Sequence, residues 1–389
     1  MNARESYKRR KELVRAALEE RGFDVAIFVS EAPCDNGHPP PPNLLYMCGI
    51  AYEEVRTPKL WPINGDPMAY ILDKNGTTSI VVTPLNGGKE AFELPEYFDH
   101  VVCVEIGMDK LSYFESYVKA IKECIEKFHP KGKIGIDLTT TSAMFASLLG
   151  KALKIPMTEN VDIHDIIYKL RLIKDDYELA EISRAIDITE KMIMEVAEKA
   201  KPGVSKNKLI KQAQARAIME GAIHSFPNFL ELERRDIIKY GDLLFLDGGC
   251  RMPSGYFSDM CRVIPVAGAL TPKIKDFLEK KIQVHKSILK FFREGVCPAD
   301  IVSETNKLHR ELGWEPITFF GHHVGLEIHD VPDLFQKLYK QPLRSGMVLT
   351  YEPVAIDKKA RLGCIMEDEI LVTPNGGKVM SSLAWDFLW

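Results

Sequence analysis

The sequence predicts a two-domain protein of the α/β (α+β) class. Its 389 residues are too many for one hydrophobic core, so two domains are expected. In the first part of the chain, short apolar runs alternate with helical patterns, which is typical of a sheet covered by helices. Near residue 160 this alternation ends at a long amphipathic segment, after which strand-like runs carry acidic residues. The predicted domains are 1–162 and 163–389.

The first domain is predicted to contain five short strands. A helix is expected from about Glu5 to Arg21, and a second helical pattern covers Tyr113–Phe128. Short apolar runs of this kind favour buried strands. The strand-like runs are DVAIFVS, MAYILD, TSIVVTP, VVCVEIG and KIGIDLT.

The second domain is predicted to open with a long amphipathic helix. Asp175 or Asp176 can cap its N-terminus, and Lys201-Pro202-Gly203 ends it. Further helices are expected at about 206–219 and 272–293, with strands between and after them. The apolar stripe of the long helix consists of Leu179, Ile182, Ile186, Ile193 and Val196.

Composition and charge exclude several classes of protein. A formal net charge of −4 does not support a basic nucleic-acid-binding surface. No apolar run approaches the roughly 18 residues that cross a membrane, and the charged N-terminus lacks the apolar core of a signal peptide. The eight cysteines form no CxxC pair, so neither a zinc finger nor a dense disulfide framework is expected. We expect a cytoplasmic protein with mostly buried free thiols.

Five residues, each in or beside an apolar strand-like run, carry the predicted chemistry. A carboxylate in such a run costs several kcal/mol unless it is paired or bound to a metal. Four converging carboxylates would repel one another, and two divalent cations would cancel their charge. An oxygen-rich set with one imidazole suits Mn²⁺, Fe²⁺ or Co²⁺, and Zn²⁺ is also compatible. The residues are Asp247, Asp259, His322, Glu352 and Glu367.

The segments around these residues resemble the pita-bread metallopeptidase family, which includes aminopeptidase P, Xaa-Pro dipeptidase (prolidase) and methionine aminopeptidase. The N-terminal runs DVAIFVS and NLLYMCG resemble the creatinase-like domain that precedes the catalytic domain of prolidases. The resemblance implies a creatinase-like α/β domain, then a pita-bread domain with a curved, largely antiparallel sheet covered by helices. It also implies a homodimer. The matching catalytic segments are LRLIKDDYEL, GDLLFLDGG, GYFSDMCR, GHHVGLEIHDVP, GMVLTYEP and MEDEILVT.

The resemblance implies a role for each predicted ligand. Asp247 would chelate one metal ion, and His322 would bind the other. Asp259 and Glu367 would bridge both ions. Glu352 would bind the same ion as His322 and could move a proton from the bridging water to the leaving amine.

Three further histidines and one tryptophan lie in the matching text or near it. His329 matches the histidine that contacts the substrate and steadies the tetrahedral intermediate, although a structural hydrogen bond is an alternative. His224 is a candidate substrate contact or, more simply, a loop histidine. His323 replaces a glycine and is expected to be a neighbour of the ligands. Trp61 could belong to a loop that reaches a partner subunit, or could pack locally.

Several residues around the predicted ligands depart from the peptidase pattern. Leu230 stands where relatives usually carry a substrate-contacting histidine, and Ile365 stands where peptidases often carry arginine. Thr318 replaces another histidine of prolidase-like members. The Asp-to-Asp spacing is one residue longer than usual, with Pro253 in the insertion. The metal ligands therefore match the family, whereas the substrate contacts do not.

The sequence favours a metal-dependent hydrolase of the Xaa-Pro dipeptidase or aminopeptidase P type. Its substrate would be a small peptide, and two divalent ions (Mn, Co, Fe or Zn) would activate water. A second interpretation is a hydrolase or lyase of a small non-peptide metabolite, similar to creatinase, ectoine hydrolase or dimethylsulfoniopropionate lyase, because of Leu230 and Ile365. A third interpretation is a non-catalytic binding protein. Neither nucleic acid nor a membrane is expected as a partner.

Overall fold

The computed structural model describes residues 1–30, 41–55, 68–83, 97–104, 110–139, 141–158, 160–230, 235–330 and 341–385. These residues form two compact units, Met1–Arg171 and Leu172–Trp389. Helix α6 (His164–Arg171) therefore lies in the first unit, whereas the sequence-based boundary at 162/163 assigns it to the second domain. Trp61 lies outside the described residues.

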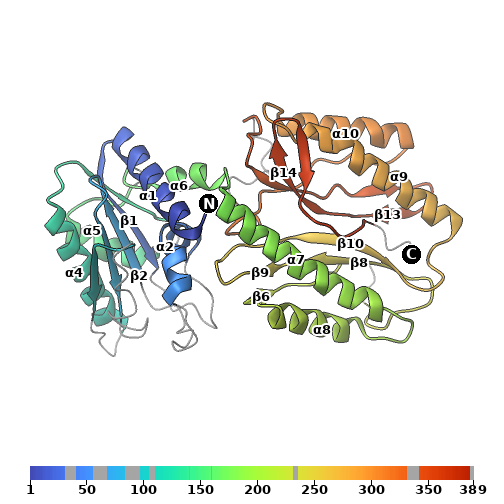
Figure 1. The fold of residues 1–389 in the computed structure, drawn as a ribbon, viewed down its shortest axis with the longest axis horizontal. Helices are drawn as coiled ribbons and strands as arrows, with labels where there is room; N and C mark the ends of the chain where they lie inside the picture. Colours follow the sequence, from blue (N-terminus) through green and yellow to red (C-terminus); the bar gives the residue numbers. More distant parts are fainter. Residues whose placement is uncertain are drawn as a thin grey trace. The chain divides into compact units, whose positions relative to one another are not determined.

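A five-stranded mixed sheet forms the centre of the first unit (Figure 1). Its order is β4-β3-β2-β1-β5, with antiparallel β1–β2 and β2–β3 pairs and parallel β1–β5 and β3–β4 pairs. All five predicted strands are present, so the predicted α/β architecture of this part is confirmed. The strands are β1 (Phe23–Ser30), β2 (Met68–Asp73), β3 (Thr78–Val82), β4 (His100–Cys103) and β5 (Lys133–Ile136).

Helices pack on both faces of this sheet. Val25, Ile27 and Val29 of β1 share a core with Ile121 and Phe145, which lie on α4 and α5. Because successive strand residues point to opposite faces, the other residues of β1 face α1 and α2, which contact this strand. The helices are α1 (Ala3–Glu20), α2 (Pro42–Val55), α4 (Lys110–Phe128), α5 (Ala143–Leu153) and α6.

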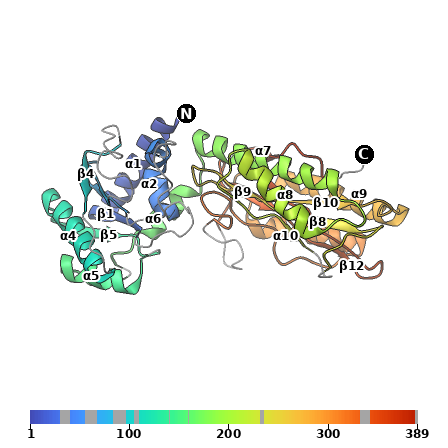
Figure 2. The same cartoon turned by 90° about the horizontal axis from the view of Figure 1, so that it is seen from below.

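Antiparallel strands form the centre of the second unit and lie between two pairs of helices (Figures 1 and 2). Helices α7 (Asp176–Lys199) and α8 (Lys206–Met219) cover one side, and α9 (Pro272–Ile288) and α10 (Pro298–Leu312) cover the other. The predicted cap of α7 is confirmed. The Asp175 side chain accepts a hydrogen bond from the backbone N–H of Glu178, and the Glu178 side chain accepts one from the backbone N–H of Asp175. No helix in the described part of the chain is long and apolar enough to cross a membrane.

Two three-stranded sheets, β10-β8-β7 and β11-β14-β15, meet through one bridge between Cys261 and Glu367. Every pair between the described strands of this unit is antiparallel, as expected for the second domain. The strands are β6 (His224–Ser225), β7 (Asn228–Phe229), β8 (Leu243–Gly248), β9 (Cys250–Arg251), β10 (Met260–Pro265), β11 (Val348–Tyr351), β12 (Ala355–Asp357), β13 (Leu362–Cys364), β14 (Asp368–Thr373) and β15 (Gly376–Val379).

Candidate metal centre

The register of the strands brings three predicted carboxylates to one place. Asp247 on β8 lies opposite Cys261 on β10, and Glu367 lies opposite Cys261 on its other side. Directly opposed residues, and residues two apart on a strand, point to the same face of a sheet. Asp247, Glu367 and Asp259 therefore share a face, and their ligand atoms lie within 4.8 Å of one another.

A second pairing places His322 beside Glu352. Glu352 N donates to the carbonyl of Phe320 at 2.7 Å, and Thr350 N donates to the carbonyl of His322 at 2.7 Å. A Cβ at Gly321 would lie 2.1 Å from the carbonyl oxygen of Thr350, so this close approach requires glycine. His322 Nε2 consequently lies 3.3 Å from Glu352 Oε1.

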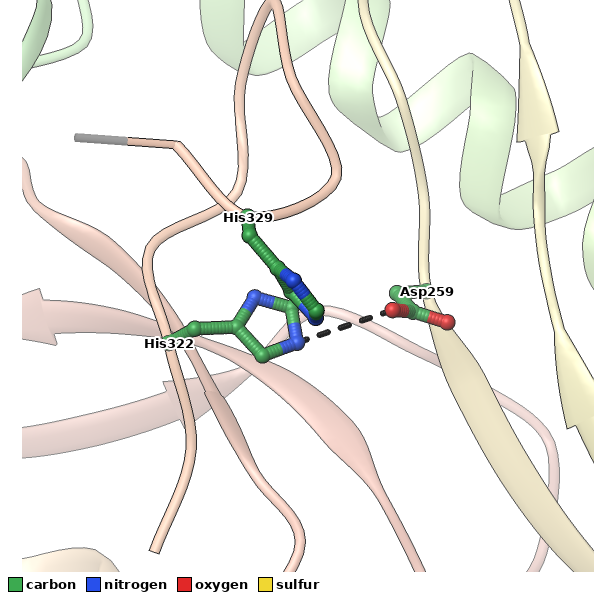
Figure 3. A group of neighbouring side chains, drawn as sticks. All are labelled: Asp259, His322 and His329. Carbon is green, nitrogen blue, oxygen red and sulfur yellow. Dashed lines mark ion pairs between the residues drawn. The ribbon is translucent and has the colours of Figure 1, made fainter. Parts of the chain in front are cut away.

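His322 connects the two halves of the cluster. Its Nε2 lies 3.6 Å from Asp259 Oδ2 and 3.6 Å from Glu367 Oε1. The ring of His329 meets the ring of His322 edge-on, with 4.1 Å between centroids. Figure 3 shows the two rings side by side and next to Asp259. Three overlapping groups of potential ligand atoms thus contain all five predicted ligands and His329.

Burial controls the ionisation of the carboxyl groups. It raises the pKa of Asp259 and Glu367 well above the ordinary range, and the neighbouring carboxylates add to the effect. Burial, together with the charge of Asp247, raises the pKa of Glu352 to about 8. Burial raises the pKa of Asp247 as well. Without a cation, this cluster holds protons at neutral pH.

The donor set fits divalent cations. Glu367 Oε1 is buried and has no hydrogen-bond partner in the described part of the chain, which is costly for an ionised oxygen unless a cation lies beside it. Burial lowers the pKa of His322 to about 4, so its imidazole stays neutral, the form that binds metals. His322 Nδ1 lies 3.1 Å from the carbonyl of His323 and must donate its proton there, which leaves Nε2 available as a ligand.

Two supporting residues were not singled out from the sequence. Thr350 Oγ1 accepts the N–H of His322 at 3.0 Å and lies 3.4 Å from Glu352 Oε1. Glu369 Oε1 accepts the N–H of Asp259 at 2.6 Å, and burial raises the pKa of Glu369 to about 8. The position of Glu369, two residues after Glu367, was the one signal that it shares a face with the cluster.

The other predicted histidines lie outside these three groups. His224 is exposed on β6, and its ring stacks on Phe226 with 6.2 Å between centroids. His323 is buried next to His322 and forms bridges with Asp330 and Leu349. A role of His224 in substrate binding stays a prediction.

The residues that depart from the peptidase pattern occupy different surroundings. Leu230 N donates to the carbonyl of Phe245 at 2.9 Å, so Leu230 continues the pairing of β7 with β8. Ile365 is half-buried, two residues before Glu367, and Thr318 is exposed. Leu230 and Ile365 line one cavity.

Comparison with protein families decides the class of this centre. The model of metallopeptidase family M24 matches residues 180–374, about half of the chain and all five residues of the cluster. The chain belongs to metallopeptidase family M24. The model of the creatinase/prolidase N-terminal domain matches residues 10–173. Membership of family M24 confirms the expected pita-bread architecture and the metallopeptidase class, and it implies divalent metal ions.

Individual relatives agree with this assignment. The Xaa-Pro dipeptidase of Pyrococcus furiosus is 29% identical over 325 residues, which cover 79% of this chain and 90% of that protein. The Xaa-Pro dipeptidase of Pyrococcus horikoshii is 28% identical over 344 residues, which cover 83% of this chain and 90% of that protein. An Xaa-Pro dipeptidase structure from Bacillus anthracis matches with a TM-score of 0.76 at 20% identity and covers 98% of this chain and 99% of that chain. At that identity, the structural likeness shows the shared fold.

Proposed function

We propose that this M24 protein is an Xaa-Pro peptidase of the dipeptidase or aminopeptidase P type, with a small peptide as substrate. The observation that carries the proposal is the cluster of four carboxylates and one imidazole, whose potential ligand atoms lie within 4.8 Å of one another in overlapping groups. The relatives that are named Xaa-Pro dipeptidase support the substrate class.

The proposed centre binds two divalent ions, with Mn, Co, Fe or Zn as candidates. Asp247 would hold one ion, His322 and Glu352 would hold the other, and Asp259 and Glu367 would contact both. When bound, such ions would supply Lewis-acid polarisation of the scissile carbonyl and would lower the pKa of a water molecule. The ionised cluster carries four negative charges, which two divalent ions balance.

Glu352 and His329 take the catalytic roles in this proposal. Glu352 lies 3.3 Å from His322 Nε2, so in the metal-loaded site its ionised carboxylate could accept a proton from the attacking water and deliver it to the leaving amine. His329 is exposed beside the cluster and can donate a hydrogen bond to the oxygen on which negative charge develops. His224 is a further candidate substrate contact.

Hydrolysis of Xaa-Pro dipeptides and longer Xaa-Pro peptides by the metal-reconstituted protein tests this function. We expect turnover that depends on added Mn²⁺ or Co²⁺. His329→Gln should keep the bound metal and lower kcat by about 100-fold or more. A fully metal-loaded protein that cleaves neither class of peptide would show that the substrate is of another kind.

A hydrolase or lyase of a small non-peptide metabolite is the second candidate. The apolar residues Leu230 and Ile365, which line one cavity, favour it. Assays with osmolytes and other small amides separate it from the peptidase. A rise in peptidase activity in the Leu230→His, Ile365→Arg double variant would indicate that the natural substrate has changed. Membership of a metallopeptidase family does not favour a non-catalytic binding protein.

We also propose that the protein is a cytoplasmic homodimer. The resemblance to prolidases supports the dimer, and the seven described cysteines, all of which are free thiols, support a reducing compartment. Light scattering after size-exclusion chromatography should give twice the mass of one chain, and a monomer that is fully active would contradict the dimer.

A further inference from the structure

Four side chains next to the metal centre form a group that the proposed metal chemistry does not use. They are His224, Phe226, Arg251 and Phe257, and we term them the arginine–aromatic group. His224 lies directly opposite Arg251 in the pairing of β6 with β9, and Arg251 lies opposite Phe257 through an isolated bridge. Directly opposed residues point to the same face of a sheet. His224, Arg251 and Phe257 therefore form one row across three neighbouring segments of the chain.

This row points to the face of the sheet that carries the metal centre. Ser258 Oγ lies 2.7 Å from Thr189 Oγ1 of α7, so the Ser258 side chain points towards that helix. Because successive side chains of a paired segment alternate between two faces, Phe257 and Asp259 point away from α7, and so does Arg251 opposite Phe257. The row is thus two residues, roughly 7 Å, from a proposed bridging ligand.

Phe226 fills the space between the row and the metal centre. Its N–H donates to the carbonyl of Gly249 at 3.1 Å, and a Cβ at Gly249 would lie 3.0 Å from Phe226 Cζ. The ring therefore lies against the backbone of Gly249, where another residue would place its side chain. Its centroid is 6.2 Å from that of Phe257 and 6.2 Å from that of His224. The three rings form a continuous aromatic surface.

Arg251 adds a positive charge to this surface. Its Cζ lies 4.8 Å from the centroid of the Phe257 ring, and its Nε donates to the carbonyl of Gly255 at 3.2 Å. These two contacts orient the guanidinium. A guanidinium donates hydrogen bonds within its own plane, so one that stacks on a ring can still bind a carboxylate through two N–H groups. The imidazole of His224, which is exposed, offers a further N–H at the same row.

The arginine–aromatic group is attached to both halves of the metal centre. It is linked to Asp259 through the chain, and Phe257 N donates to the carbonyl of Gly325 at 2.8 Å, in the loop between His322 and His329. In the proposed centre two divalent ions balance the four carboxylates. The metal-loaded cluster therefore does not repel a negative charge that lies roughly 7 Å away.

We propose that the arginine–aromatic group binds a carboxylate of the substrate next to the scissile amide. An extended peptide spans about 3.3–3.6 Å per residue, so a group roughly 7 Å from a bridging ligand belongs to one of the residues that flank the amide. Two carboxylates of a short peptide qualify: an acidic side chain before proline, and the C-terminal carboxylate of a dipeptide. Arg251 and His224 donate to it, and the rings contact the carbon atoms beside it. The inference rests on the proposed peptidase function.

Steady-state kinetics of the Mn²⁺-loaded protein with two pairs of peptides tests this recognition. Glu-Pro and Gln-Pro differ only in the charge of the first side chain, and Leu-Pro and Leu-Pro amide differ only in the charge of the C-terminus. We expect a kcat/KM at least about tenfold higher for the charged member of one pair, mainly through KM, and that pair identifies the carboxylate. Equal kcat/KM values within both pairs would overturn the inference.

Two matched variants locate the effect. Arg251→Met removes the charge and keeps an apolar stem, and Arg216→Met removes an arginine of α8 that lies 2.8 Å from Glu220. Arg251→Met should raise KM for the charged peptide at least about tenfold, with kcat and metal content unchanged, and Arg251→Lys should restore part of the preference. Arg216→Met should leave the preference intact. A preference that survives in Arg251→Met, or an equal loss for the charged and the uncharged peptide, would overturn the inference.

Failure of the peptidase proposal is visible separately, as an absence of turnover for all four peptides at full metal loading. Calorimetric titration of the metal-loaded protein with the same peptides still tests the arginine–aromatic group in that case. Tighter binding of a charged member, which Arg251→Met weakens at least about tenfold and Arg216→Met does not, supports the inference. Equal affinities within both pairs, or no binding at millimolar peptide, overturn it.

Discussion

At the residue scale, Glu367 shows most clearly why the second unit needs a cation. This residue is 1% exposed, and its Oε1 has no hydrogen-bond partner among the described residues. Burial raises its pKa well above the ordinary value, and the nearby carboxyl groups raise it further. An ionised carboxylate in this position destabilises the fold unless a positive charge lies next to it. A metal ion bound beside Glu367 is therefore expected to stabilise the fold of this unit.

Substitution of Glu367 separates the charge from the shape of the side chain. In the metal-free protein at pH 7, folding requires Glu367 to take up a proton, and Glu367→Gln removes this requirement, so the free energy of unfolding should stay equal or rise by about 1–3 kcal/mol. The stabilisation by added Mn²⁺ should disappear, since an amide cannot bridge two cations. Thermal unfolding with and without Mn²⁺ measures both effects. The exposed Glu311→Gln on α10 serves as the control, and a variant at 367 that keeps the full Mn²⁺-induced shift would contradict its role as a ligand.

At the scale of the elements, Arg262 on β10 holds the strands behind the metal centre together. Arg262 Nη2 lies 2.6 Å from Asp368 Oδ1, and both side chains are 0% exposed. Its Nη1 donates to the carbonyl of Glu367 at 2.7 Å, and Trp385 Nε1 donates to Asp368. Burial raises the pKa of Asp368, but Arg262, His285 and Ser381 together outweigh this effect, and the pKa falls to about 2. The pair thus fixes the backbone of a proposed ligand.

Removal of Arg262 should be costly because it leaves a buried charge unpaired. Arg262→Met is expected to lower the free energy of unfolding by about 3–5 kcal/mol, and the double variant Arg262→Met, Asp368→Asn should recover much of that loss. Urea unfolding measures both. Arg15→Met removes the exposed pair with Glu12 and should cost less than about 1 kcal/mol. A double variant as unstable as the single one would contradict this account of the pair.

The elements that carry the site were predictable from local patterns, but their cross-connections were not. The capping residue Asp175 and the strand before Asp247 follow from spacing and composition alone. The hydrogen bond from Asp259 N to Glu369, in contrast, joins residues 110 positions apart. Such links depend on strand register, which a local pattern does not contain. The cavity that Leu230 and Ile365 line could not be predicted from the sequence for the same reason.

At the scale of the whole molecule, two kinds of buried group give the stability opposite dependences on pH. Burial is the larger cause and the charge of Asp247 the smaller one that raise the pKa of Glu352 from 4.5 to about 8. Its contribution to stability is therefore fully present below pH 4.5 and is lost as the pH rises through 8. Burial lowers the pKa of His285 from 6.5 to about 4, so its contribution is present above pH 6.5 and is lost as the pH falls towards 4. The metal-free protein is therefore expected to be most stable at mildly acidic pH.

Bound metal should abolish the loss of stability that the metal-free protein shows as the pH rises. Between pH 6 and pH 8 the metal-free protein should lose on the order of 2 kcal/mol of unfolding free energy, because Glu352 and its neighbours must ionise without a counter-ion. The Mn²⁺-loaded protein should not show this loss, and its metal affinity should rise with pH, since binding displaces protons. Chemical unfolding at pH 6, 7 and 8 measures the difference. A metal-free protein that becomes more stable over this range would contradict the raised pKa values.

The central claim is that Asp247, Asp259, His322, Glu352 and Glu367 together hold two divalent ions. Elemental analysis of the purified chain after reconstitution with Mn²⁺ or Co²⁺ and extensive dialysis tests it most directly, with Asp259→Asn measured in parallel. The account predicts two tightly bound ions per chain in the unmodified protein and fewer than one in the variant, which lacks a bridging carboxylate. Less than one ion per chain in the unmodified protein, or an equal content in both, would contradict it.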